Sequence, residues 1–334
     1  MEISKHYIKN TLYNNSLVWK TIEFFQGMSY VFNYLWHYQF HLTAKSSIKE
    51  VNVEFSSECN LRCKFCSLDH TKPRTFIEEQ TLESLLIQLL TDKRFHTVER
   101  LQLYNAGETL LHPKRFELLE LIKSYKQKFK EKGVRFPKVI LLTNATLLRK
   151  KVSVQLVDLD IVDEMMVSLD GGTPEAFETM RDRAKWPVFY RNIIDFIDYR
   201  NEKNSKTTLK TVSIIPAEKP FTLDWMHPEF REVLEKADSF ELRRLHNWAG
   251  EVEVESTNKP HKIGCTLLMK QMVLLPNGDI TVCCSDLNSR GVIGNLKTST
   301  LYQIYNTPKR LSWLKLMFQN RKYEIDLCKN CETF

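Results

Sequence analysis

The sequence lacks several features that would place the protein in a common class. Its N-terminus has no short apolar core followed by a small-residue cleavage site, so a secretory signal is not indicated. No nucleic-acid-binding motif accompanies the net charge of +7, and the densest basic run, residues 123–135, is typical of the solvated face of a helix. We therefore expect a cytoplasmic protein that does not bind nucleic acid.

Charged residues are absent from residues 24–42, which are rich in aromatic side chains. Apolar residues recur on one helical face from Phe24 to Leu35, and from Trp36 to Leu42 they alternate with polar ones. Glutamine, asparagine and glycine within this run argue against a membrane span. We expect the segment to pack on the rest of the fold. Contact with a partner or a membrane surface is the alternative.

Cysteine is infrequent but clustered. The chain has eight cysteines, and without export they are not expected to form a disulfide framework. Cys59, Cys63 and Cys66 have the spacing C-x3-C-x2-C, and no fourth cysteine lies nearby. Three thiolates from one loop can bind three irons of a cubane iron–sulfur cluster and leave the fourth iron open, as a catalytic metal requires. A structural zinc site, which needs four ligands, is the alternative.

Segments of strand length alternate with helical patterns between about residues 50 and 245. The helical patterns cover residues 81–90, 113–133 and 188–201. Six strand–helix repeats predict an α/β fold whose parallel sheet curls into a partial (β/α)6 TIM-like barrel. Functional loops of such a sheet follow the carboxyl ends of the strands, and the cysteine triplet directly follows the first strand. The expected strands cover residues 51–55, 100–105, 138–143, 163–170, 209–215 and 240–246.

The cysteine triplet, with Phe65 before its third cysteine, resembles the motif of the radical S-adenosylmethionine (SAM) enzymes. The resemblance implies a [4Fe–4S] cluster whose open iron is chelated by the methionyl amine and carboxylate of SAM. It also implies reductive cleavage of SAM to a 5′-deoxyadenosyl radical, which takes a hydrogen atom from an unactivated carbon. The electron would come from a donor such as flavodoxin or ferredoxin. Phe65 would lie against the adenine.

Two further segments match elements of this family after the second and third expected strands. Ala106, Gly107 and Glu108 resemble its Gly-Gly-Glu-Pro element, which holds the methionyl amino group, with alanine for the first glycine. The proline of that element is Thr109 here. Asn144 belongs to a segment that resembles the family's Thr-Asn-Gly element. The resemblance implies that these residues surround SAM.

Residues 167–181 resemble the Ser-Leu-Asp-Gly segment of the same family, with its trailing arginine. The resemblance implies that Ser168, Asp170 and Arg181 contact SAM, Arg181 by pairing with its carboxylate. A surface ion pair is the other interpretation of Arg181.

A second cysteine set follows residue 258, where the strand–helix alternation stops. Residues 270–284 predict a β-hairpin that turns at Asn277-Gly278, and a helix is expected over residues 299–318. The spacing C-x12-G-x4-C resembles the start of the SPASM extension of radical enzymes. Only four ligands fit, as in its shortened twitch form, and they would hold one auxiliary [4Fe–4S] cluster. A zinc knot is the alternative. The four residues are Cys265, Cys283, Cys328 and Cys331.

Cys284 falls outside both ligand sets. It has three interpretations: a small buried side chain, a ligand in place of Cys283, or a hydrogen-atom donor. A radical epimerase requires such a donor, commonly a thiol.

These patterns predict an aromatic-rich extension over residues 1–49, a radical SAM partial barrel over 50–257 and a SPASM/twitch domain over 258–334. The expected enzyme abstracts hydrogen from a small molecule such as a sugar or aminocyclitol, giving dehydrogenation or epimerisation. The segment before the first strand is too short for the usual peptide-recognition domain. Epimerisation or cross-linking of a ribosomally made peptide is the alternative substrate class. A non-catalytic iron–sulfur protein is the alternative from another class.

Overall fold

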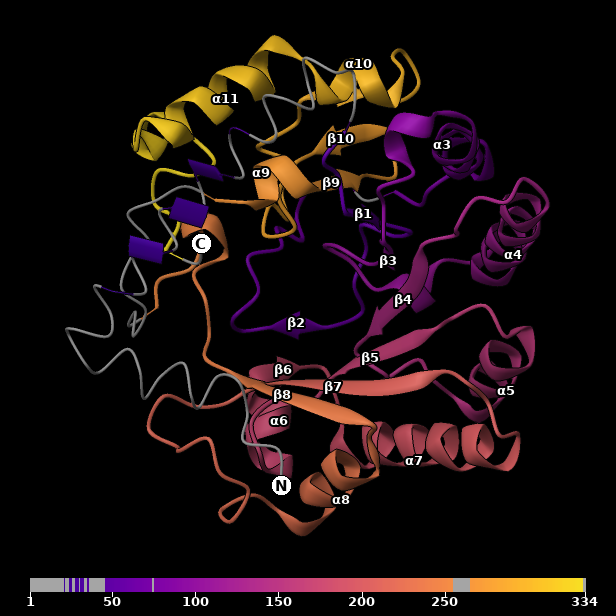
Figure 1. Cartoon of the computed structure of the whole chain (residues 1–334). Helices are drawn as coiled ribbons and strands as arrows, with labels where there is room; N and C mark the ends of the chain where they lie inside the picture. The colour runs from indigo at the N-terminus through magenta and orange to yellow at the C-terminus, as the bar shows by residue number, and fades with distance from the viewer. Residues whose placement is uncertain are drawn as a thin grey trace.

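The computed structural model describes residues 46–73, 75–254 and 265–332, together with eight positions between 21 and 35. A curved sheet forms its centre, and helices cover the convex side (Figure 1). The strand order is β11-β10-β9-β1-β3-β4-β5-β7-β8. The six strands from β1 to β8 are parallel, which confirms the predicted partial barrel. They are β1 (Glu50–Val53), β3 (Arg100–Leu103), β4 (Lys138–Thr143), β5 (Glu164–Ser168), β7 (Thr208–Ile214) and β8 (Ser239–Arg243).

Helices connect the parallel strands, as right-handed crossovers require. An α-helix follows each of β1, β3, β4 and β7, two follow β5, and within the described residues a 3-10 helix follows β8. The three helices whose residues were predicted are present, and three shorter ones accompany them. The helices are α3 (Glu79–Thr91), α4 (Arg115–Glu131), α5 (Lys150–Leu159), α6 (Pro174–Met180), α7 (Trp186–Glu202) and α8 (Pro228–Lys236). Among the described residues, 3-10 helices lie at Lys93–Phe95, Thr109–Leu111, Trp248–Gly250 and Lys322–Glu324.

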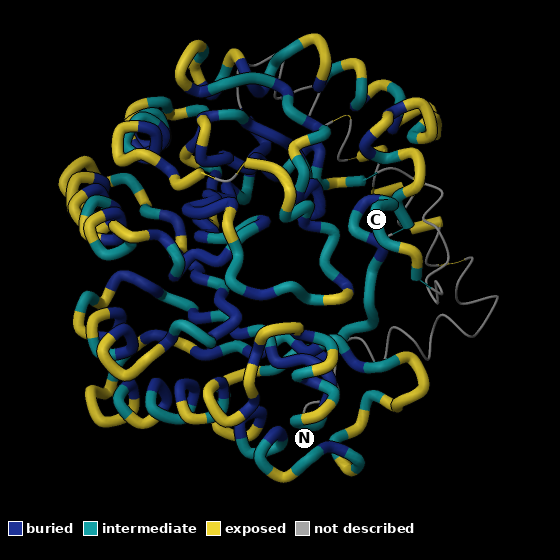
Figure 2. The backbone as a smooth tube through the Cα atoms, turned by 180° about the vertical axis from the view of Figure 1, so that it is seen from behind, coloured by how far each residue is buried: buried dark blue, intermediate teal, exposed yellow. Residues whose placement is uncertain are grey.

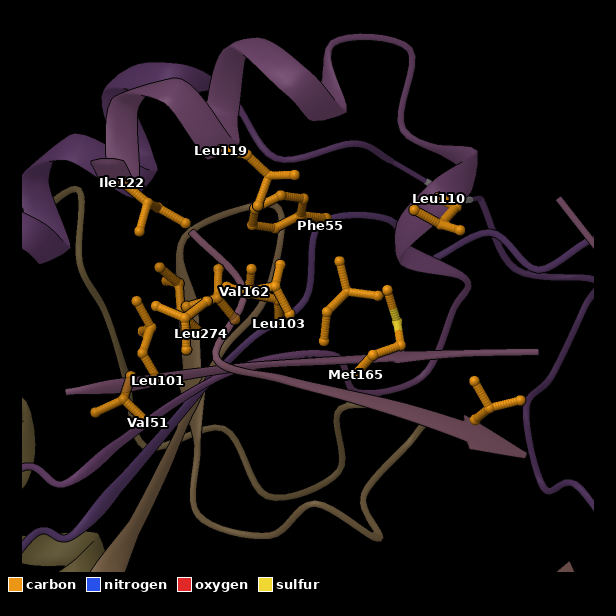
Figure 3. Close-up of a cluster of buried hydrophobic side chains, with 14 of the residues drawn as sticks. Val51, Phe55, Leu101, Leu103, Leu110, Leu119, Ile122, Val162, Met165 and Leu274 are labelled. Carbon is orange, nitrogen blue, oxygen red and sulfur yellow. The ribbon is translucent and has the colours of Figure 1, made fainter. Parts of the chain in front are cut away.

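An apolar core lies between the convex face of the sheet and the helices. Leu101 and Leu103 of β3 lie beneath Ile122 and Leu119 of α4 (Figure 3). Burial of one such leucine side chain contributes about 2 kcal/mol. Figure 2 shows the same division along the backbone, with buried strands inside exposed outer helices. Because side chains alternate along a strand, Asn52 and Gln102 face the concave interior, which is therefore polar.

The C-terminal cysteine region shares the barrel's sheet. Strand β9 (Gln271–Leu274) pairs in parallel with β1, and β10 (Asp279–Thr281) and β11 (Gly294–Asn295) continue the sheet antiparallel. The hairpin turns at Asn277-Gly278 as predicted, with a φ of 93° at Gly278 that favours glycine.

The single helix expected over residues 299–318 is two helices, α10 (Leu301–Tyr305) and α11 (Pro308–Phe318). Pro308 has no N–H to continue α10, and its fixed φ suits the first position of a new helix. A one-turn helix, α9 (Leu267–Lys270), precedes β9.

Six apolar side chains of the N-terminal segment occupy helical backbone positions and are 42–67% exposed. The expected packing of this face on the fold is therefore not observed at these positions. The convex face of the sheet is already covered by the barrel's own helices. Residues 36–42 lie outside the described residues. No helix in the described part of the chain is long and apolar enough to cross a membrane. The six residues are Phe24, Phe25, Met28, Val31, Phe32 and Leu35.

Candidate functional site

The loop after β1 brings Cys59, Cys63 and Cys66 together. Cys63 lies in a short strand, β2 (Arg62–Cys63), which pairs with β6 (Arg181–Asp182) in a ladder that the sequence did not predict. The Cys66 N–H donates to the Cys63 carbonyl at 3.1 Å. The three thiols lie close enough for their charges to interact. The structure therefore gathers the predicted triplet at the carboxyl edge of the sheet.

Burial controls the protonation of this triplet. It raises the pKa of Cys59 to about 12 and that of Cys63 to about 11. The Arg181 guanidinium opposes the shift at Cys63, where its Nη1 lies 4.0 Å from Sγ. Cys59 and Cys63 therefore favour the neutral thiol, and metal binding at these residues would release their protons.

All seven predicted metal ligands are cysteine thiols, which are the usual ligands of iron–sulfur clusters. A single Zn²⁺ gathers its thiolates around one centre, whereas each thiolate of a cubane cluster binds a different iron. The grouping into a set of three thiols and a set of four is compatible with two clusters.

The segment 106–108 packs directly against the cysteine loop. A Cβ at Gly107 would lie 2.0 Å from the Ser56 carbonyl oxygen and 2.5 Å from that of Glu58, so only glycine fits. The backbone N–H of Glu108 donates to the same Glu58 carbonyl at 2.8 Å. The N–H of Ala106 donates to Oε2 of Glu54, the residue directly after β1, at 3.1 Å. This segment therefore fixes the backbone beneath Cys59.

The Glu108 carboxylate connects this segment with the end of β4. It is buried and accepts from Thr143 Oγ1 at 2.8 Å and from the Asn144 N–H at 2.9 Å. Burial raises the pKa of Glu108, and these hydrogen bonds oppose that shift. The Asn144 side chain donates to Asn60 at 3.0 Å and lies 4.0 Å from the Cys59 sulfur. The predicted residues Glu108 and Asn144 thus meet at the loop.

Arg181 and Asp170 form a buried ion pair. Arg181 Nε lies 2.7 Å from Asp170 Oδ2, and the second carboxylate oxygen accepts from the Ile214 N–H at 2.6 Å. Arg181 is 6% exposed and Asp170 is 1% exposed, so the interpretation of Arg181 as a surface ion pair is wrong. Phe65 lies 5.7 Å from the guanidinium carbon. Ser168 ends β5, two residues before Asp170.

The structure also brings together the four cysteines predicted to bind the auxiliary cluster, although the first and the last lie 66 positions apart in the chain. Electrostatic interactions connect Cys265 with Cys331, Cys283 with both, and Cys328 with Cys265 and Cys331. The Cys331 N–H donates to the Cys328 carbonyl at 3.1 Å, which closes the C-terminal turn. The set lies beyond the end of β10, beside the open side of the barrel.

Cys284 lies between the auxiliary ligand set and the barrel interior, and its charge interacts with Cys265 and Cys283 on one side. Its N–H donates to Gln271 Oε1 at 3.0 Å, and the same side chain contacts its thiol. Gln271 lies on the concave face, where its amide donates to interior side chains of β1. Tyr104 and Arg243 are close enough to interact with the charge of Cys284. Cys284 therefore contacts the barrel interior through Gln271 and also lies within electrostatic range of the auxiliary ligands.

Residues at and just after the end of β8 complete the interior, and their roles were missed by the sequence analysis. Arg243 pairs with both oxygens of Glu241, at 2.9 and 3.0 Å. The rings of His246 and Trp248 lie 4.3 Å apart. Burial, reinforced by Arg243, lowers the pKa of His246 to about 4. The one signal available was position, since Arg243 and His246 belong to the last predicted strand, residues 240–246, and Trp248 follows its carboxyl end.

The chain is similar to several solved structures across most of its length. BtrN in complex with AdoMet and 2-DOIA is 19% identical, with a TM-score of 0.58, and the match covers 86% of this chain and 94% of that one. Streptococcus suis SuiB bound to S-adenosylmethionine is 17% identical, with a TM-score of 0.58, over 88% and 74%. Native anSMEcpe with bound AdoMet is 15% identical, with a TM-score of 0.54, over 85% and 88%. These likenesses show the fold.

No curated protein sequence matches the chain. The model of the Radical SAM superfamily matches residues 53–227, and that of the SPASM iron–sulfur cluster-binding domain matches residues 265–332. The two matches imply SAM, a [4Fe–4S] cluster and an auxiliary cluster as cofactors. The chain therefore belongs to the Radical SAM superfamily and carries a C-terminal SPASM domain.

Proposed function

We propose that Cys59, Cys63 and Cys66 hold the SAM-binding cluster and that Cys265, Cys283, Cys328 and Cys331 hold the auxiliary one. When bound, the first cluster supplies the electron that cleaves SAM. The segment 106–108 supports the cluster loop and offers backbone carbonyls to the methionyl amine. Phe65, Asn144, Ser168, Asp170 and Arg181 line the same edge of the sheet and complete the SAM site.

The proposed reaction is epimerisation at a carbon–hydrogen bond of a small polar molecule such as a sugar or aminocyclitol. The 5′-deoxyadenosyl radical takes a hydrogen atom, giving 5′-deoxyadenosine and a substrate radical. The Cys284 thiol then returns a hydrogen atom to the opposite face of that carbon and becomes a thiyl radical. One electron from a low-potential protein donor such as flavodoxin or ferredoxin, with one proton, restores the thiol.

One observation carries this choice: Cys284 contacts Gln271, which lies in the barrel interior, and Tyr104 and Arg243 lie within electrostatic range of it. A dehydrogenase needs no thiol at that position. The polar interior, with Tyr104, Gln102 and Arg243, suits a substrate with hydroxyl or amino groups better than an apolar one. The chain also spans most of BtrN, whose structure contains 2-DOIA, which supports the choice of a small molecule.

A peptide substrate is the second candidate, because SuiB, which has the same fold, is also seen bound to its precursor peptide SuiA. That match covers 73% of the SuiB chain, so SuiB has parts with no counterpart here. The peptide class would require recognition by residues outside the interior described above.

The test is made anaerobically with reconstituted protein, a low-potential reductant and SAM in heavy water. Candidate sugars, aminocyclitols and peptides are each supplied to the wild type and to Cys284→Ala. We expect 5′-deoxyadenosine from both proteins, and a product of unchanged connectivity carrying one deuterium from the wild type alone. Ser312→Ala, which removes a small polar side chain from the exposed surface of α11 and leaves the surroundings of Cys284 unchanged, is the control.

Other outcomes would overturn parts of the proposal. A product lighter by two hydrogens, made equally by Cys284→Ala, would replace epimerisation by dehydrogenation. Turnover of a peptide alone would replace the substrate class. No 5′-deoxyadenosine from a fully loaded wild type would remove SAM cleavage itself.

A further inference from the structure

The loop that carries Cys66 is held by one side chain of the SPASM domain. Asn288 Nδ2 donates to the Ser67 carbonyl at 2.7 Å, and Asn288 Oδ1 accepts from the Asp69 N–H at 2.9 Å. The two residues of the loop lie about 220 positions earlier in the chain. One amide therefore makes a donor and an acceptor contact on either side of Leu68, directly after Cys66.

Asn288 is itself fixed by the segment that follows β8. Its Nδ2 also donates to Glu251 Oε2 at 3.0 Å. The other oxygen of Glu251 lies 2.9 Å from Arg290 Nε, an ion pair that is not aligned as a hydrogen bond. Arg290 donates in turn to the Ala249 carbonyl at 3.0 Å. Residues 249–251 and 288–290 thus form one polar bracket beside the cysteine loop.

The same segment reaches the auxiliary site on its other side. Asn247 Nδ2 donates to the Asn330 carbonyl at 2.7 Å, and Asn247 Oδ1 accepts from the Glu332 N–H at 3.2 Å. These two contacts flank Cys331. A Cβ at Gly250 would lie 2.4 Å from the Cβ of Asn330, so the backbones are in close contact. Trp248, between them, packs against the small apolar cluster of Leu68, Ala106 and Leu287, and Cys59 and Cys66 pack against the same cluster.

The backbone of this segment is strained. Trp248 and Ala249 have φ values of 46° and 57°, which cost residues with a side chain about 1 kcal/mol or more each. Such a conformation persists only where surrounding contacts determine it. Here those contacts are the two cysteine-bearing regions on either side.

We propose that Asn288 is a positioning residue for the SAM-binding cluster, acting on Cys66 through Ser67 and Asp69. The proposal also makes Asn247 the residue through which cluster ligation at the auxiliary site affects the position of Asn288. Ligation at Cys328 and Cys331 orders Asn330 and Glu332, which hold Asn247. The bracket then holds the loop of the first cluster. This rests on the assignment of Cys66 as a cluster ligand and is independent of the substrate and of Cys284.

The test measures SAM binding at the first cluster by electron paramagnetic resonance of the reduced, reconstituted protein, since SAM changes the signal of the cluster that it binds. We expect Asn288→Ala to raise the apparent Kd for SAM about tenfold, as loss of an outer-sphere partner does at metal sites. Asn288→Asp keeps the acceptor for Asp69 but loses both donated bonds and places a carboxylate against Glu251. It should not restore binding.

Asn295→Ala is the matched control. It removes the same side chain from the same domain, but its bonds are to Asn277 and Asp279 at the opposite end of β10. We expect wild-type SAM affinity from this variant. A wild-type Kd for Asn288→Ala, or a lower thermal midpoint with the SAM-dependent signal intact, would overturn the proposal and leave Asn288 a stabilising contact.

The connection to the auxiliary site is tested by a double-mutant cycle. The Cys328→Ser/Cys331→Ser variant should weaken SAM binding in the wild-type background, and add little in Asn247→Ala, because that variant has already lost the connection. Additive effects would overturn the connection. Glu251→Gln replaces the larger changes if these prevent folding. It weakens the ion pair with Arg290 but keeps an acceptor for Asn288, so we expect a smaller rise in the Kd for SAM than in Asn288→Ala. Cys66→Ala is run in parallel: if it retains the cluster, the ligand assignment has failed and not the role of Asn288.

Discussion

Cys63 and Arg181 are cross-strand partners in the β2–β6 ladder, with Arg181 Nη1 4.0 Å from the Cys63 sulfur. The guanidinium is buried and paired with Asp170, so one positive and one negative charge lie beside the same candidate cluster thiolate. Because water does not screen either charge, each acts on the thiolate more strongly than a surface charge would.

The two charges are expected to shift the reduction potential of the cluster in opposite directions. Arg181→Gln should lower the midpoint potential and Asp170→Asn should raise it, each on the order of 50 mV, because reduction adds negative charge next to them. A redox titration followed by electron paramagnetic resonance measures both. The exposed Arg183→Gln is the control for Arg181. Shifts of the same sign in the two variants would contradict the assignment.

Gly107→Ala should prevent assembly of the first cluster. The added Cβ would meet backbone carbonyls of the cysteine loop, which cannot move away as a flexible side chain could. We expect iron loss at the first site and no SAM-dependent spectral change. Gly133→Ala is the control, since nothing lies within 4 Å of its Cβ position. Its positive φ should cost only about 1 kcal/mol, with clusters retained.

Glu108→Gln should destabilise the fold near the SAM site. In the variant, the side-chain NH2 would replace one carboxylate oxygen, which now accepts from either Thr143 Oγ1 or the Asn144 N–H. Two donors would then face each other, and the buried donor would lose its acceptor. The expected cost is about 1 to 3 kcal/mol, seen as a lower thermal midpoint of the reconstituted protein. Glu120→Gln on the exposed face of α4 should change stability by less than about 0.5 kcal/mol. Equal midpoints for the two variants would count against this role.

His246 should make the protein less stable in mild acid. Its pKa is near 6.5 when unfolded and about 4 when folded, mainly because of burial. Above pH 6.5 both states are neutral at His246 and the residue has no effect. As the pH falls toward 4 the unfolded state binds a proton that the folded state resists, which costs up to about 3 kcal/mol. Thermal scans between pH 7 and 5 should therefore show a smaller loss for His246→Gln than for the wild type.

The order of the barrel strands follows from the sequence because each strand is a short apolar run next to a helical pattern. Pairing β9 with β1 could not be predicted in the same way, since Gln271 and Glu50 are far apart in the chain and carry no signal of their contact. Likewise, Pro308 marks the break between α10 and α11 only once the end of α10 is known.

The same difference between local patterns and long-range contacts decides which residues of the candidate site could be predicted. The cysteines were predictable because their spacing within one loop is local chemistry. Asn288, Trp248 and Tyr104 were not, because their roles arise from contacts between segments separated by many residues. A lone asparagine in a loop gives no indication that its amide meets a cluster loop about 220 positions away.

The pairing of β9 with β1 limits how far the barrel and the SPASM domain can be separated or exchanged. Since the SPASM hairpin continues the barrel sheet, exchange of this domain between related enzymes would also exchange the neighbour of the first barrel strand. A chain that stops before residue 258 would expose the backbone of Glu50–Val53 as an open sheet edge, which invites intermolecular strand pairing. The barrel and the SPASM domain therefore share one sheet, and removing either of them would leave a strand of the other without its neighbour.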